Sequence, residues 1–133
     1  MLGKATTGWQ ILWVAIWINL SGSVRWMLFA RPRFAAHYKG MGLAYPNTPL
    51  INILWVVWAV LAAVLVVFLS KKFSVLHTIV LSWLVIFAMT WIVQWNSGVF
   101  PLQLLWIAVP WSLAEVFIAA LIANKLQGRG AAS

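Results

Sequence analysis

The chain contains no cysteine and only one acidic residue among its 133 residues. The absence of cysteine excludes disulfide bonds, thiolate catalysis and metal sites built on thiolates. The remaining candidate metal ligands are His37, His77 and Glu115, and the two histidines lie in different segments. No nucleophile–base pair and no metal-ligand set is visible. We therefore expect no metal, no cofactor and no enzymatic activity.

Charge of either sign is also scarce, since charged residues make up 8% of the chain and apolar residues 65%. A soluble domain has about 25% charged and about 45–50% apolar residues. A soluble core of this chain length could not bury so much apolar surface, so the solvent must be lipid. With about 20 residues per span, the chain has room for four helices. The predicted fold class is all-α, an integral membrane bundle of four transmembrane helices forming a single domain over residues 1–133.

The apolar runs predict spans at about residues 8–29, 50–70, 73–95 and 99–124. The first run is longer than the apolar core of a signal peptide and lacks a clean small-residue cleavage site, so we interpret it as a retained span. In the loop that follows, Pro32 could begin a short interfacial helix that ends before Gly40. A short turn around Ser97 predicts that the last two spans form an antiparallel hairpin. Pro110 lies inside the last run and predicts a kink there.

The formal net charge of +8 comes from basic residues spread over the ends of the segments. They form no basic run, so we expect no nucleic-acid partner and instead contact with the headgroups of the lipid bilayer. The side that carries the chain ends has Lys4, Lys71, Lys72, Lys125 and Arg129, and the other side has Arg25, Arg31, Arg33 and Lys39. This small excess predicts that both termini are cytoplasmic.

The single acid, Glu115, stands inside the last apolar run, where a bare carboxylate costs about 3 kcal/mol. With a rise of about 1.5 Å per residue, Glu115 lies about 5 Å from the middle of its span, on the side of the chain ends. Asn19 falls near the middle of the first span, and His77 falls about 10 Å from the middle of the third, toward the same side as Glu115. Ser112 lies one turn before Glu115 on the same helix face. These four residues form the predicted polar site.

Arg25 falls on the opposite side of the membrane midplane from Glu115. The expected vertical gap of about 15 Å exceeds what the two side chains can bridge. We therefore predict that His77 or Asn19 lies nearer to Glu115 than Arg25 does, and an Arg25–Glu115 ion pair would contradict this placement of the first and last spans. The role of Glu115 stays open between a proton- or cation-binding carboxylate, a structural residue that joins spans one, three and four, and a side chain that snorkels to the surface.

Eleven tryptophans are the most conspicuous positive feature of the composition. Six of them fall toward the side of the loop at 30–49, namely Trp26, Trp55, Trp58, Trp91, Trp95 and Trp106. One interpretation is an interfacial belt, because tryptophan prefers the level of the lipid headgroups. The other is an aromatic pocket that stacks on a flat or cationic lipophilic molecule.

Two short elements, Trp26-Met27-Leu28-Phe29 and Met41-Gly42-Leu43, together with the apolar pattern of the last span from Leu102 to Leu121, carry a resemblance. In these features the chain resembles a bacterial family of small four-span membrane proteins of unknown function. The resemblance implies no activity and assigns no functional residue.

We expect an integral protein of the bacterial cytoplasmic (inner) membrane that works as a homo-oligomer or within a larger membrane complex. The first functional hypothesis is a structural or accessory subunit of such a complex. The alternative is a small proton-coupled transporter of a lipophilic or cationic substrate, with Glu115 as the coupling carboxylate.

Overall fold

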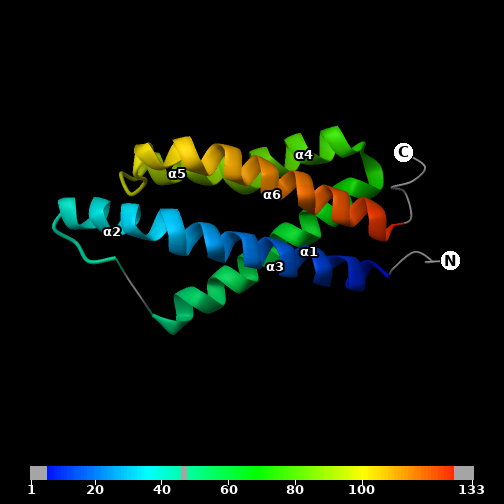
Figure 1. Cartoon of the computed structure of the whole chain (residues 1–133), viewed down its shortest axis with the longest axis horizontal. Coiled ribbons are helices and arrows are strands. Elements are labelled where there is room, and N and C mark those ends of the chain that lie inside the picture. Colours follow the sequence, from blue (N-terminus) through cyan, green and yellow to red (C-terminus); the bar gives the residue numbers. More distant parts are fainter. Residues whose placement is uncertain (1–5, 46–47, 128–133) are drawn as a thin grey trace.

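The computed structural model describes residues 6–45 and 48–127, and within them it is built from helices (Figure 1). Four helical segments are long and apolar enough to cross a membrane: Thr7–Gly40, Pro49–Lys72, Val75–Asn96 and Leu102–Leu126. The predicted class, an all-α bundle of four transmembrane helices, is confirmed. The start of the first segment and the end of the last lie at the same end of the bundle (Figure 1). We call the half of the bundle at that end the terminal half.

Each membrane-crossing segment except the second is divided by a change of helix type. The first comprises α1 (Thr7–Arg25), the π-helical turn η1 (Trp26–Ala30) and α2 (Arg31–Gly40). The second is α3 (Pro49–Lys72), and the third comprises α4 (Val75–Trp83), the π-helical turn η2 (Leu84–Ala88) and α5 (Met89–Asn96). The fourth begins with the short 3₁₀ turn η3 (Leu102–Leu104) and continues as α6 (Leu105–Leu126).

The first segment differs from its predicted length, because it does not end near Phe29 but continues through α2 to Gly40. The predicted short helix after Pro32 exists, yet it extends the membrane span without a break. The combined segment has 34 residues, or about 51 Å at about 1.5 Å per residue. The hydrocarbon core of a bilayer is only about 30 Å thick, so part of this helix must project beyond it.

The π-helical turn η1 explains how the helix passes Pro32. A proline has no N–H to donate and its ring collides with the preceding turn, which ordinarily stops or bends a helix. In η1 the Arg31 N–H reaches back to the carbonyl of Trp26, five residues earlier, and the Arg33 guanidinium donates to the carbonyl of Phe29 at 2.8 Å. The widened turn and the arginine side chain thus provide hydrogen bonds to two carbonyls of the turn that precedes this proline, those of Trp26 and Phe29.

Pro110 lies inside α6, and the helix continues on both sides of it. A proline in this position cannot donate to the carbonyl of Trp106. The bend expected there stays a prediction.

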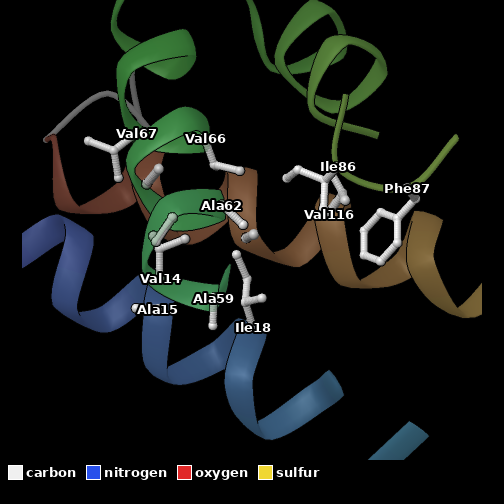
Figure 2. Packing of buried hydrophobic residues seen from close by; sticks show 13 residues of the cluster. Val14, Ala15, Ile18, Ala59, Ala62, Val66, Val67, Ile86, Phe87 and Val116 are labelled. Atoms are coloured by element: carbon white, nitrogen blue, oxygen red, sulfur yellow. The ribbon is translucent and has the colours of Figure 1, made fainter. Parts of the chain in front are cut away.

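The terminal half holds the main hydrophobic core, where small and β-branched side chains from four helices meet. Val14 and Ile18 of α1 face Ala59 and Ala62 of α3, and Val116 of α6 belongs to the same cluster (Figure 2). α3 packs on α1, α4 and α6. Small residues allow such helices to approach closely, which favours the van der Waals packing that helps helices to associate in lipid.

Candidate functional site

The fold brings the single acid of the chain to a basic partner. Glu115 on α6 is 2% exposed, and its Oε2 atom lies 3.4 Å from Nη1 of Arg25 on α1. The side chain of Arg25 is 13% exposed and that of Glu115 only 1%. The prediction that Arg25 lies too far away to reach Glu115 is therefore wrong.

Two physical causes explain the error in the predicted depth. The first helix continues past residue 29, so its true midpoint lies closer to Arg25 than the predicted span implied. In addition, side chains lean toward the N-terminus of their own helix. Because α1 and α6 are antiparallel, Arg25 and Glu115 lean toward one another. Gly22, one turn before Arg25, marks the meeting point, since a Cβ atom added there would lie 3.9 Å from Glu115 Oε1 and 3.7 Å from Arg25 Nη2.

Three polar side chains from α1 and α6 surround the pair. Trp17 Nε1 donates to the backbone carbonyl of Glu115 at 2.9 Å, and Trp111 Nε1 donates to Ser21 Oγ at 3.1 Å. The Ser21 hydroxyl lies close enough to the carboxylate to interact with it. The second carboxylate oxygen, Oε1, is buried and has no hydrogen-bond partner among residues 6–45 and 48–127. The carboxylate is therefore fixed on one side and has unused acceptor capacity on the other.

In the described part of the chain, the other members of the predicted polar site form no hydrogen bond to this pair. His77 is exposed in the first turn of α4, where its Nδ1 atom lies 2.7 Å from Oγ of Ser74, the residue that caps this helix. Asn19 is exposed on α1 and lines the same cavity as Arg25. Ser112 is buried and accepts a hydrogen bond from Trp83 Nε1 at 2.8 Å, which joins α4 to α6. Among the described residues, no three His, Cys, Asp or Glu side chains are grouped in a way that could hold a metal ion.

A cavity of about 920 Å³ lies next to the ion pair, in the half of the bundle away from the chain ends. We call this half the cavity half. The cavity lies between the α1–α2 helix, the first half of α3, the η2–α5 segment and the chain leading into α6. We call the part of the cavity beside the ion pair, lined by Gly22 and Arg25, its inner end; the lining also includes Tyr45 and Gln94.

Aromatic rings form a closed circuit of contacts along the cavity wall. Each ring lies beside the next with centroids 5.5 to 6.3 Å apart. This spacing is favourable for paired rings. The circuit runs through Trp26, Trp55, Trp58, Phe87, Trp91, Phe100 and Phe34 and returns to Trp26.

Four of the six tryptophans predicted for an aromatic pocket belong to this circuit: Trp26, Trp55, Trp58 and Trp91. The other two lie outside the cavity, with Trp95 60% and Trp106 88% exposed. Sequence reasoning did not single out the phenylalanines of the circuit. The signal that could have found Phe87 is its spacing, because it lies one helical turn before Trp91 on the same face.

The charge on the cavity wall has one sign. The ionisable residues that line it are Arg25, Arg31 and Tyr45, and Glu115 stands behind Arg25 without lining the cavity. Burial raises the pKa of Tyr45, and the neighbouring Tyr38 adds to the rise, so Tyr45 is uncharged near neutral pH. The guanidinium carbon of Arg25 lies 5.2 Å from the centre of the Phe87 ring, where the ring face attracts a cation.

No protein-family model, curated protein or solved structure matches this chain.

Proposed function

We propose that this protein binds an amphipathic molecule in its membrane-embedded cavity and carries it between the two faces of the membrane. The observation that supports this proposal is the cavity itself, which leads from the aromatic circuit to the buried Arg25–Glu115 pair. Small-molecule sites typically have volumes of about 300–1,000 Å³ and apolar walls with a few convergent polar groups. The cavity falls within that range and has that character. This favours the transporter hypothesis over the hypothesis of an accessory subunit.

A route into the cavity from the lipid fits its position between helices. The cavity lining includes Met27 of η1 and Val56 of α3, which are 61% and 50% exposed on the apolar outer surface. The wall of the cavity is thus continuous with the surface that contacts lipid. An amphipathic ligand could enter sideways while its chain stays among the lipid tails.

A binding measurement with three matched probes tests the proposal. The probes carry the same doxyl-labelled alkyl chain and end in an alcohol, a trimethylammonium group or a sulfonate. With the protein in lipid nanodiscs, we expect at least one probe to show a motionally restricted component in its electron paramagnetic resonance spectrum beyond that of ordinary boundary lipid. Thr90→Trp, which places a large ring on the α5 wall of the cavity, should remove this component.

The matched control is Ile92→Trp on the same helix, because Ile92 is 64% exposed and does not line the cavity. It should leave the restricted component unchanged. If neither substitution alters the spectrum of any probe, the cavity is not a binding site and the proposal fails.

A second candidate function, a structural subunit of a membrane complex, is favoured by a different surface. A shallow, almost wholly apolar depression lies between the first and last helices, lined by Trp13, Ile16, Trp17, Leu20, Ile122 and Leu126. A helix of a partner protein or of a second copy would fit such a surface. Purification under mild conditions separates the two functions, since a subunit comes out with stoichiometric partners and a carrier as a monomer or homo-oligomer.

We further propose that the protein lies in the bacterial cytoplasmic membrane with both chain ends in the cytoplasm. Lys71, Lys72 and Lys125 gather at the end of the bundle that carries the chain ends, while Lys4 and Arg129 lie outside the described residues. Cytoplasmic loops carry an excess of Lys and Arg. Reporter fusions after Lys72 and at the C-terminus should both report the cytoplasm, and opposite signals would contradict a four-span topology.

A further inference from the structure

We propose that the ligand of the cavity is an amphipathic anion. Its headgroup replaces Glu115 as the ion-pair partner of Arg25, and Glu115 takes up a proton. This inference rests on the proposed binding function and names the class of molecule bound. It also assigns the Arg25–Glu115 pair a role as an exchange site for an anion and a proton.

The charge of the wall selects against a cation. The lining carries the guanidinium groups of Arg25 and Arg31 and no carboxylate. Although aromatic rings attract cations, the face of Phe87 is already occupied by Arg25. A cationic headgroup in this cavity would meet the guanidinium of Arg25 in front of its partner Glu115, and the guanidinium of Arg31 with no acid on the wall to offset it. An anionic headgroup would meet guanidinium donors whose planar fork suits sulfonate, phosphate and carboxylate oxygens.

The geometry of the ion pair makes Arg25 available for exchange. The contact with Glu115 is 3.4 Å long, whereas a strong charge-assisted hydrogen bond is about 2.7–2.9 Å. Arg25 also borders the cavity, so a headgroup at the inner end would compete with Glu115 for the same guanidinium. The arginine thus stands between two alternative acceptors, one fixed in the protein and one brought by the ligand.

Removal of Arg25 from the pair would leave the carboxylate of Glu115 uncompensated inside the bundle. A buried unpaired charge is too costly to persist, and it neutralises instead. Protonation of Glu115 removes this unpaired negative charge, and the net charge of the site stays zero. Before binding the pair is neutral, and afterwards Arg25 with the bound anion is neutral and Glu115 carries the proton. The unpartnered Oε1 atom beside Gly22 is the place for that proton.

No other titratable group among residues 6–45 and 48–127 is placed to take over this role. The cavity holds only Arg31, which stays charged, and Tyr45, whose pKa is raised by burial. The ionisable residues of α3, α4 and α6 other than Glu115 are Lys71, Lys72, His77 and Lys125, all near helix ends. Those of α2 other than Arg31 do not line the cavity: Arg33, His37, Tyr38 and Lys39. A pH dependence of binding would therefore report Glu115.

The three alkyl probes described above separate this inference from the proposed function. The sulfonate is permanently charged, so any pH dependence must come from the protein. We expect the sulfonate to bind about tenfold or more tightly than the alcohol, and the trimethylammonium probe to bind weakest. Over the pH range in which Glu115 ionises, sulfonate affinity should fall about tenfold per pH unit as the pH rises, because each anion binds with one proton. A pH indicator in weak buffer should record the uptake of one proton per sulfonate.

Substitutions of the pair test its role directly. Glu115→Gln leaves Arg25 without a competing charge, so sulfonate binding should become independent of pH, as tight at high pH as at low pH. The double variant Arg25→Gln/Glu115→Gln removes both charges together and avoids a lone buried charge. It should fold and lose the preference for the sulfonate. Lys39→Gln is the matched control, because it also removes one positive charge but from an exposed residue of α2 outside the cavity.

The outcomes are distinguishable. If all three probes bind equally and Thr90→Trp abolishes their binding, the cavity is a binding site but the inferred anion selectivity is wrong. If the sulfonate binds best with no change across pH and no proton uptake, the exchange at Glu115 is overturned. If no probe responds to Thr90→Trp, the proposed function itself fails.

Discussion

The two halves of the bundle are packed by different kinds of side chain. In the terminal half, α3 and α6 contribute a row of small and β-branched residues that are almost fully buried, among them Ala62, Ala63, Val66, Ala119 and Ala123. In the cavity half, the aromatic rings of the circuit lie among the lining residues of an open volume. Small residues bring helix backbones together, whereas the rings of the circuit meet in tilted and edge-to-face pairs around an open volume.

This difference indicates how a chain of 133 residues combines rigidity with a binding site. Close packing in the terminal half fixes the relative positions of the helices, and this allows the cavity half to retain an open volume. The Arg25–Glu115 pair lies where the two halves meet, with the carboxylate held by α6 and the guanidinium turned toward the cavity.

The largest expected effect comes from breaking the pair at this boundary. Arg25→Leu or Glu115→Leu alone should lower the free energy of unfolding by about 3–5 kcal/mol, because the remaining member of the pair loses its partner and must either stay charged without it or, for Glu115, take up a proton. Unfolding in detergent, followed by circular dichroism, measures the loss. The double variant Arg25→Leu/Glu115→Leu should recover most of it. A double variant as unstable as the sum of the single variants would show that the pair is not energetically coupled.

Overpacking should separate the two halves directly. Ala63 in the terminal half is fully buried, whereas Ala35 lines the cavity and is exposed. Ala63→Leu should cost about 1–3 kcal/mol, because the added methylene groups find no space. Ala35→Leu should change the unfolding free energy by less than about 0.5 kcal/mol, as most surface substitutions do. Equal losses at both positions would mean that the cavity half is as tightly packed as the terminal half.

Sequence reasoning gave the class of fold and the number of spans, because length and hydropathy are local properties of the chain. It failed at the end of the first span, where Arg31, Pro32 and Arg33 read as a loop. The π-helical turn that carries the helix through these residues depends on non-standard hydrogen bonds that no propensity describes. The longer first helix is also one of the two reasons why the predicted depth of Arg25 was wrong.

The candidate site shows the same limit. The depth and cost of Glu115 were enough to single it out, but its partner depends on which way two side chains lean. The gathering of four tryptophans along one cavity, and the exposure of Trp95 and Trp106, depend on the rotation of each helix about its axis. Rotation is set by packing against neighbouring helices, so the apolar sequence of a span does not specify it.

A hydrogen bond between helices offers a smaller test of the comparison. Trp83 of α4 donates to Ser112 of α6 at 2.8 Å, and Ser112 in turn donates to the carbonyl of Val109 at 3.0 Å. Trp83→Phe keeps most of the apolar area and removes the donor, so we expect a loss of about 1–1.5 kcal/mol in unfolding free energy. Trp106→Phe, on the exposed surface of α6, is the control and should have little effect. A loss of unfolding free energy below about 0.5 kcal/mol would show that this hydrogen bond adds little to the packing of α4 on α6.

The smallest expected effect concerns Gly22, at the boundary between the two halves. A Cβ atom at this position would meet its nearest neighbours, Arg25 Nη2 and Glu115 Oε1, at 3.7 and 3.9 Å, which is ordinary van der Waals contact. Since glycine is less favourable than alanine inside a helix, Gly22→Ala should raise the unfolding free energy by about 1 kcal/mol or less. The added methyl group would also occupy space beside the unpartnered Oε1 atom and at the inner end of the cavity.

We therefore expect the Gly22→Ala variant to be slightly more stable and to bind the sulfonate probe more weakly. The control is Gly8→Ala, at the exposed start of α1, which should change neither property appreciably. A more stable variant with unchanged binding would place the headgroup away from Gly22, and a less stable one would show that the close approach of α1 and α6 at this point leaves no room for a methyl group.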